Sequence, residues 1–205
     1  MISALVAFCQ DLVVTFGYSG VVFVAVLENF FPPLPSEAIF PFVGFVAAQG
    51  KLALLSVIVA GVGGTFIGAL FWYLAGRWLG SDNLKKLIAS YGRSFHIKLG
   101  DIERAERWFE RYEKPAVLFA RVIPLVRTFI SVPAGFVEMN LVLFSLLTLV
   151  GSTVWIGLLS YAGFALGERW ESVVPYVENY EVVAFILAAA AIVLVFLRGY
   201  RDRHH

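Results

Sequence analysis

Two uninterrupted apolar stretches dominate the hydrophobic pattern of the chain. Residues 52–75 and 141–166 contain no charged side chain, and each exceeds the roughly 20 residues that a helix needs to cross a bilayer. A shorter apolar stretch, 182–197, is flanked by aromatic and basic side chains, which suit a membrane interface. The pattern therefore predicts three transmembrane helices, the last of them within 178–199.

Two further apolar stretches are interrupted by proline. Residues 19–49 and 115–137 each contain several prolines, which break a helix and free backbone groups that lipid cannot satisfy. We therefore interpret both stretches as re-entrant hairpins, each built of two half-helices that enter and leave on the same face of the membrane. The prolines that we assign to the breaks are Pro32, Pro33, Pro35, Pro124 and Pro133.

Composition and charge placement support an integral membrane protein. Only 15% of the residues are charged and 60% are hydrophobic, whereas a soluble domain carries about 25% charged residues. Residues 77–114 hold nine of the 16 basic side chains, and 198–203 hold three more, while 168–181 carry four Glu and one Arg. The positive-inside rule places the first two regions in the cytoplasm, and they share that face only if 115–137 re-enters.

The basic linker itself contains a predicted helix. Residues 101–113 place apolar side chains at helical spacing, and Glu103 and Arg107 are an i,i+4 pair of opposite charge. Such an amphipathic helix suits the inner membrane surface. Packing against the protein's own cytoplasmic face is the alternative.

The two broken stretches belong to an internal repeat. Pro33-Leu34 and Pro124-Leu125 are 91 residues apart, as are Gly44-Phe45-Val46 and Gly135-Phe136-Val137. One hairpin plus one span crosses the membrane an odd number of times, so the second copy is inverted, a design typical of transporters whose site lies near the midplane. We predict an all-α membrane protein with an N-terminal interfacial segment (1–17), repeat 1 (18–79), a cytoplasmic amphipathic linker (80–114), repeat 2 (115–167) and a C-terminal transmembrane helix (178–199).

Four ionisable side chains lie inside the predicted hairpins: Glu28, Glu37, Arg121 and Arg127. A charge at bilayer depth costs roughly 2.5–3.5 kcal/mol on insertion scales. One explanation is that these side chains pair and lock the hairpins together. The other is that Arg121 and Arg127 bind a phosphate headgroup with Ser36, which caps the half-helix that Glu37 opens, while Glu28 and Glu37 carry protons or balance charge.

The remaining features indicate packing rather than chemistry. Gly64 and Gly68 lie four residues apart within an apolar span and predict close helix packing. Cys9, the single cysteine, is predicted to be a small buried hydrophobe. No group of His, Cys and carboxylate residues has metal-ligand spacing, so we expect neither a metal nor another cofactor.

Two runs of sequence resemble the signatures of the DedA family, also called SNARE-associated or VTT-domain proteins. Residues 28–37, ENFFPPLPSE, are similar to the first signature. Residues 119–128, FARVIPLVRT, with Pro133-Ala134-Gly135, are similar to the second. The resemblance extends from about Gly17 to Gly167, although some members carry Gly-Asp where this chain has Ser36-Glu37.

The resemblance implies a transporter of lipids across the bacterial plasma membrane. It implies two inverted hairpin repeats, dependence on the proton-motive force, and the return of undecaprenyl phosphate to the cytoplasmic leaflet. By the same resemblance, Glu28 and Glu37 match the family's functional acids, and Arg121 and Arg127 match its functional arginines.

Our leading interpretation is therefore a multi-pass protein of the bacterial inner membrane that flips undecaprenyl phosphate inward, coupled to protons. A flippase or scramblase for phospholipids of the phosphatidylethanolamine type is the alternative within transport. A membrane lipid phosphatase would need a histidine nucleophile, and His96 is the only histidine outside the terminus. A scaffold without transport is compatible with structural pairing of the charges. The expected partner is a membrane lipid rather than nucleic acid, and a homo-oligomer is compatible with the sequence.

Overall fold

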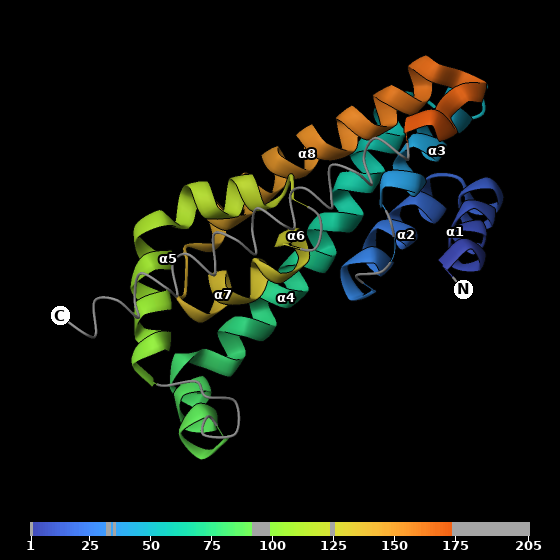
Figure 1. Ribbon diagram of the computed structural model, residues 1–205. Coiled ribbons are helices and arrows are strands. Elements are labelled where there is room, and N and C mark those ends of the chain that lie inside the picture. Colours follow the sequence, from blue (N-terminus) through green and yellow to red (C-terminus); the bar gives the residue numbers. More distant parts are fainter. Residues whose placement is uncertain (1, 32–33, 35, 92–98, 124–125, 174–205) are drawn as a thin grey trace.

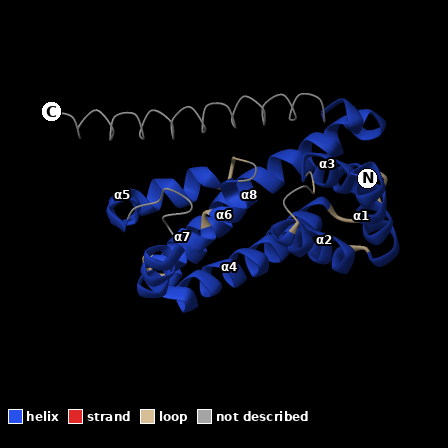
Figure 2. Ribbon diagram, turned by 60° about the horizontal axis from the view of Figure 1, so that its bottom comes forward, coloured by secondary structure: helices blue, strands red, loops and turns tan. Residues whose placement is uncertain are grey.

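Helices make up the chain wherever regular structure is described (Figure 1). The computed structural model describes residues 2–31, 34, 36–91, 99–123 and 126–173, and these residues contain no strand (Figure 2). In chain order the elements are α1 (Ile2–Phe16), α2 (Tyr18–Phe30), α3 (Ser36–Ala48), α4 (Leu54–Tyr91), α5 (Leu99–Ala120), α6 (Val126–Phe129), α7 (Ser131–Phe136), α8 (Leu141–Leu166) and a 3₁₀ helix, η1 (Gly167–Val173).

Two of the helices, α4 and α8, are long and apolar enough to cross a membrane. The membrane-length segments are Leu54–Gly80, within α4, and Leu141–Trp170, which comprises α8 and the start of η1. The two uninterrupted spans predicted from the sequence are therefore confirmed as helices. Asn140 fixes the start of α8, because its side chain accepts hydrogen bonds from the backbone N–H groups of the second and third residues of the helix. Gly80 has a non-helical backbone (φ 66°, ψ 157°) and bends α4 at the end of its apolar portion.

The two long helices run antiparallel and lie against each other. A Cβ on Gly61 of α4 would lie 3.2 Å from Cγ2 of Ile156 on α8. Further along α4, the ring of Tyr73 stacks on the ring of Phe144, with centroids 4.6 Å apart. Residue numbers thus rise along one helix as they fall along the other. Large apolar side chains on the outer sides of both helices are exposed, which in a membrane protein is the surface that lipid covers.

The short helices form two groups beside opposite halves of this pair (Figure 1). α2 and α3 lie beside the first half of α4 and the second half of α8, whereas α7 lies beside the second half of α4 (Figure 1). α2 and α3 are the two half-helices expected in the first broken stretch. Whether they re-enter on one face of the membrane stays a prediction.

Glycines allow the short helices to approach the long ones closely. A Cβ on Gly44 of α3 would lie 1.9 Å from the carbonyl oxygen of Ser160 on α8. A Cβ on Gly135 of α7 would lie 2.1 Å from the carbonyl oxygen of Tyr73 on α4. Any larger side chain at these glycines would force the helices apart.

The long helices contribute glycines to the same two contacts. A Cβ on Gly163 of α8 would lie 1.9 Å from the carbonyl oxygen of Pro41, and one on Gly76 of α4 would lie 2.3 Å from the carbonyl oxygen of Val132. Gly76 and Gly163 are 87 residues apart. Each of the two contacts therefore uses one glycine from a short helix and one from a long helix.

The close helix packing predicted at Gly64 and Gly68 is confirmed, and the helix that packs there is α2. A Cβ on Gly64 would lie 2.4 Å from the carbonyl oxygen of Val22, and one on Gly68 would lie 2.6 Å from Cβ of Asn29. The two glycines lie one turn apart on α4, so together they hold α2 along the long helix.

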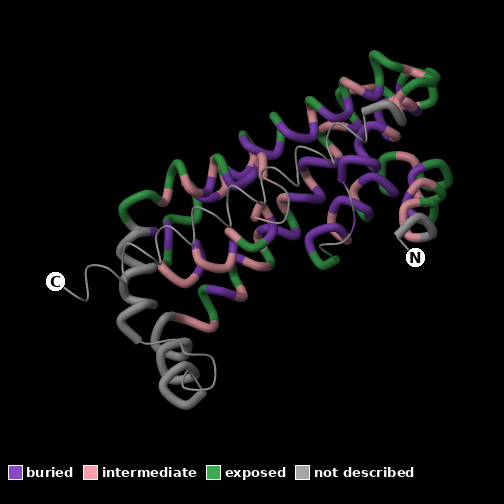
Figure 3. Tube along the Cα trace, in the orientation of Figure 1, coloured by how far each residue is buried: buried purple, intermediate pink, exposed green. Residues whose placement is uncertain are grey.

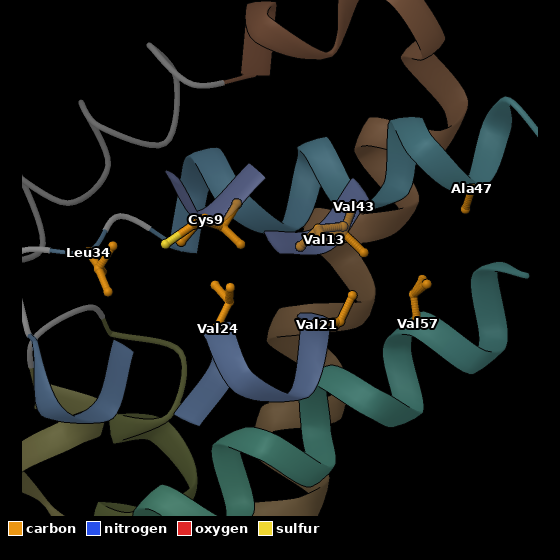
Figure 4. Packing of buried hydrophobic residues seen from close by; sticks show 9 residues of the cluster. Cys9, Val13, Val21, Val24, Leu34, Val43, Ala47 and Val57 are labelled. Carbon is orange, nitrogen blue, oxygen red and sulfur yellow. The ribbon is translucent and has the colours of Figure 1, made fainter. Parts of the chain in front are cut away.

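An apolar cluster joins the N-terminal helix to this group of helices (Figure 4). Cys9, in α1, is fully buried within it, which confirms its predicted role as a small hydrophobe. Gly17 has a positive φ of 59° and turns the chain sharply between α1 and α2. Buried residues continue along the inner sides of α2, α3, α4 and α8 (Figure 3). The residues that follow α1 and belong to this cluster are Val21, Val24, Leu34, Ile39, Val43, Ala47 and Val57.

The helix predicted over 101–113 is part of the longer α5, which runs on through Pro115 to Ala120. Two helical segments meet within α5 at a bend at Tyr112 (φ −119°, ψ 17°), close to the end of the predicted helix. Where repeat 2 starts stays a prediction. The bend is expected three residues before a proline, whose ring clashes with the carbonyl of the preceding turn and which donates no hydrogen bond.

Several predicted features lie outside the described residues. These are the helix within 178–199, His96, and the break prolines Pro32, Pro33, Pro35 and Pro124. Pro133 is described and lies in the first half of α7.

Candidate functional site

An ion pair links the two broken stretches. Glu28, in the last turn of α2, lies 3.2 Å from Arg127 of α6, measured from Oε1 to the guanidinium nitrogen. The two side chains are only 2% and 11% exposed. A buried charge is strongly unfavourable without a partner, so each side chain compensates the charge of the other. The second carboxyl oxygen of Glu28, Oε2, is buried and has no hydrogen-bond partner.

Arg121 is held by neutral acceptors and lies beside this pair. It is 2% exposed, and its guanidinium donates to the backbone carbonyl of Arg127 and to the hydroxyls of Ser131 and Thr148, each at 3.0 Å. The guanidinium also lies over the ring of Phe144, 5.4 Å from its centroid. Arg121 therefore cross-links the end of α5 to α6, α7 and α8. Its Nε–H remains buried without a partner.

A second layer of side chains holds Phe144 beneath Arg121. The fully buried ring of Tyr73 stacks on Phe144, and the Tyr73 hydroxyl donates to the backbone carbonyl of Met139. Arg77 in turn donates to the Tyr73 hydroxyl at 3.4 Å. A chain of contacts thus runs from Arg77 through Tyr73 and Phe144 to the buried Arg121.

A small cavity opens beside the two arginines where α4 and α8 cross. Its volume of about 10 Å³ is roughly the space that one water molecule needs. The wall is formed by α2, α4, α6, α8 and the end of α5, through the side chains of Asn29, Thr65, Arg121, Arg127, Ser152, Trp155 and Ile156. The cavity is therefore lined by both arginines and by neutral polar groups.

The position of this cavity along the two spans is compatible with the predicted site near the membrane midplane. Thr65 lies eleven residues after Leu54, where α4 begins, and Ser152 lies eleven residues after Leu141, where α8 begins. At a rise of about 1.5 Å per residue, both are about 16 Å from the helix start. That distance is close to half of a hydrocarbon core roughly 30 Å thick.

Ser36 and Glu37 form a pair of their own at the start of α3. Both are buried, and the Ser36 hydroxyl donates to Oε1 of Glu37 at 2.6 Å. Within the described part of the chain, neither side chain has an ion pair or hydrogen bond with an arginine. Of the predicted site residues, the structure thus brings together Glu28, Arg121 and Arg127.

Reasoning from the sequence missed the neutral polar groups of the site. Asn29 packs against Gly68 of α4, and its backbone carbonyl accepts a hydrogen bond from Trp72 at 2.9 Å. Thr65 and Ser152 are isolated hydroxyls within apolar spans. The available signal was their spacing, because these two residues are 87 positions apart, like Gly76 and Gly163.

The VTT domain matches residues 34–165 of the chain. An "Alkaline phosphatase-like protein" of Lactococcus lactis subsp. lactis (strain IL1403) is 38% identical over 89% of this chain and 86% of its own length. "Undecaprenyl phosphate transporter A" of Bacillus subtilis (strain 168) is 34% identical, covering 88% of this chain and 87% of that protein. The protein of the same name from Staphylococcus aureus (strain NCTC 8325 / PS 47) is 30% identical, covering 92% and 94%. No solved structure matches the chain.

Proposed function

The chain belongs to the VTT-domain family, the DedA family, and on that premise we propose that it flips undecaprenyl phosphate from the outer to the cytoplasmic leaflet, coupled to the proton-motive force. The family and the relatives named as undecaprenyl phosphate transporters support a role in membrane lipid transport. The headgroup of this lipid is a bare phosphate, for which arginine is the best-matched side chain.

The observation that carries this proposal is the buried pair of Glu28 and Arg127 beside the cavity. Arginine side chains carry a positive charge in proteins. The Glu28 carboxylate loses its charge when it takes up a proton. Arg127 can therefore exchange partners, binding Glu28 when the acid is ionised and a lipid phosphate when the acid is protonated.

The size of the cavity supports a proposal that the described conformation is the closed state of this cycle. A space of about 10 Å³ accommodates roughly one water molecule and is too small for a phosphate group. Protonation of Glu28 removes its attraction for Arg127 and thereby favours opening. Glu37, held by Ser36 at the start of α3, balances the charge of the arginines, and Ser36 with the adjacent helix N-terminus offers the headgroup further N–H and O–H donors.

The glycine contacts support an inverted repeat with two re-entrant hairpins. Gly44 and Gly135 are 91 residues apart, and Gly76 and Gly163 are 87 residues apart. In each copy the second arm of one hairpin packs on the long helix of the other copy. On this proposal the broken stretches enter from opposite leaflets and meet at the cavity, and the linker and C-terminus lie in the cytoplasm.

Hydrolysis of a lipid phosphate is the second candidate, because relatives from Lactococcus lactis are named alkaline phosphatase-like. Among the described residues, no group of three or more His, Cys, Asp and Glu side chains is placed to hold a metal ion. The site itself combines two arginines with one nearby carboxylate and hydroxyls that line the wall. This composition favours binding and release of the phosphate, so we rank transport first.

Transport by purified protein in liposomes tests the proposal. Undecaprenyl phosphate with a reporter group is placed in one leaflet, and its movement is followed with and without a pH gradient. We expect movement of undecaprenyl phosphate that the gradient accelerates and that Glu28→Gln abolishes. Phosphatidylethanolamine moving faster than undecaprenyl phosphate would favour the phospholipid alternative, and release of inorganic phosphate would favour the enzyme.

A further inference from the structure

Two hydroxyls of the cavity wall have no role in the proposed function. Thr65 on α4 and Ser152 on α8 line the same cavity as Arg121 and Arg127. They are 4% and 3% exposed. The Thr65 hydroxyl is buried beside the Glu28 carboxylate, and no hydrogen bond of ordinary geometry satisfies it. A buried hydroxyl without a partner is unfavourable, so its presence at this point requires an explanation.

Thr65 is not the only unsatisfied group at this site. Nε of Arg121 and Oε2 of Glu28 are also buried without a hydrogen-bond partner. These atoms come from α4, from the end of α5 and from α2, and two of the three residues line the cavity. Two unsatisfied donors, the Thr65 hydroxyl and the Nε–H of Arg121, thus converge on the cavity from separate elements, and Oε2 of Glu28 is an unsatisfied acceptor nearby. Such a convergence is typical of a binding site for a polar ligand.

The two hydroxyls occupy matching places in the two long helices. Each lies eleven residues after the start of its helix, and each directly follows a glycine, Gly64 in α4 and Gly151 in α8. Because the helices are antiparallel and cross here, one hydroxyl approaches the cavity from each side. A headgroup that arrives from either leaflet therefore meets the same kind of donor at the midplane.

Resting on the proposed function, we propose that Thr65 and Ser152 complete a headgroup site that is selective for phosphate monoesters. When the pair of Glu28 and Arg127 opens, the two hydroxyls donate to terminal phosphate oxygens, and Arg127 and Nε of Arg121 donate to the others. A monoester offers one more terminal oxygen than a diester, so it satisfies this set of donors more completely. The headgroup of phosphatidylethanolamine is a diester, so it leaves a donor unpaired.

Neutral donors also suit transport better than further charges would. A transported group must bind well enough to enter the site and weakly enough to leave it. Hydroxyls stabilise the phosphate in the membrane interior without adding a charge that would hold it there. They also add directional hydrogen bonds from α4 and α8, two helices that carry neither arginine.

The test compares matched substitutions in purified protein reconstituted in nanodiscs. Thr65→Val keeps the side-chain volume and removes the hydroxyl, whereas Thr65→Ser keeps the hydroxyl and removes a methyl group. Ser152→Ala removes the second hydroxyl. Ser160→Ala is the control, because Ser160 is a fully buried serine of the same helix that does not line the cavity. The probes are undecaprenyl phosphate, inorganic phosphate and phosphatidylethanolamine.

We expect Thr65→Val and Ser152→Ala each to weaken undecaprenyl phosphate binding about tenfold, the effect of losing one hydrogen bond to a charged group. Thr65→Ser and Ser160→Ala should stay within about twofold of wild type, and phosphatidylethanolamine binding should not change. If inorganic phosphate competes with undecaprenyl phosphate for the wild-type protein and competes less well for Thr65→Val, that result assigns recognition to the phosphate group itself. Absence of competition, with lipid binding still weakened, assigns the site to lipid-linked phosphate.

Two results would overturn the inference. The first is wild-type affinity in both Thr65→Val and Ser152→Ala. The second is a loss in Thr65→Ser as large as that in Thr65→Val, which would mean that the methyl group's packing is responsible. A wild-type protein that binds no undecaprenyl phosphate would instead reject the proposed function, and with it this site, before any variant is compared.

Discussion

The ion pair between Glu28 and Arg127 makes a quantitative prediction about stability. Both side chains are almost completely buried, at 2% and 11% exposure. Removing one partner leaves a buried charge without compensation, whereas removing both leaves none. We therefore expect Glu28→Gln and Arg127→Gln each to destabilise the protein, and the double variant to be more stable than the sum of the single effects implies.

The distance sets the size of the effect. Two unit charges 3.2 Å apart attract each other by about 5 kcal/mol at an effective dielectric constant of about 20. Breaking a buried pair by removing one partner typically costs about 3–5 kcal/mol. Glutamine retains some hydrogen bonding to Arg127, which reduces the loss. We accordingly expect a coupling energy of about 2–4 kcal/mol between the two positions.

The coupling is measured by a double-mutant cycle, using reversible unfolding in mixed micelles at neutral pH. A second cycle with Glu138→Gln and Arg127→Gln is the matched control, because Glu138 is an exposed residue of the loop after α7. That control should be additive. A coupling for Glu28 and Arg127 below about 0.5 kcal/mol, the usual error of additivity, would refute the pair as the contact that joins the two broken stretches.

Three further predictions follow from the packing, the site and the charge pattern. Gly163→Ala should lower stability by about 1–3 kcal/mol or more, because its Cβ would lie 1.9 Å from a backbone oxygen, whereas Gly157→Ala, with nothing within 4 Å, should leave the melting temperature unchanged. Arg127→Lys should keep the melting temperature and lose most transport, because lysine retains the charge but not the planar fork that binds phosphate; wild-type transport would contradict this. In a Cys9→Ser background, a cysteine at Arg203 should react only with reagents that reach the cytoplasm, and labelling from outside would contradict the predicted topology.

The long spans could be predicted from the sequence because their signal is local. An uninterrupted apolar stretch such as 141–166 satisfies its backbone hydrogen bonds within one helix, and its ends follow from composition alone. The bend within α5 could not be predicted in this way. The periodicity predicted a helix over 101–113, whereas α5 spans Leu99–Ala120 and bends at Tyr112, three residues before Pro115. The orientation of the segments on either side of a bend depends on packing with other elements, and that packing is not visible in the local sequence.

The charged half of the candidate site was also accessible from sequence, because buried charges are rare and require partners. The neutral half was not. Ser131, Thr148 and Phe144 surround Arg121 from different segments of the chain, and none of them differs locally from an ordinary membrane-helix residue. Hydroxyls in such helices commonly bond to their own backbone. Only the three-dimensional arrangement identifies the ones that bind the guanidinium.

The sequence treats Arg121 and Arg127 as an equivalent pair on either side of one break, and the structure separates them. Arg121 donates three hydrogen bonds to neutral acceptors on the protein, so most of its guanidinium is committed to holding α5, α7 and α8 together. Arg127 is more exposed and has a carboxylate partner, which can lose its charge by protonation. On the proposed mechanism, a residue that exchanges partners during transport needs a partner of adjustable charge, and of these two arginines it is Arg127 that has one. On this proposal, Arg121 holds the second broken stretch in position. Arg127 is the arginine whose binding of phosphate is coupled to protonation of Glu28.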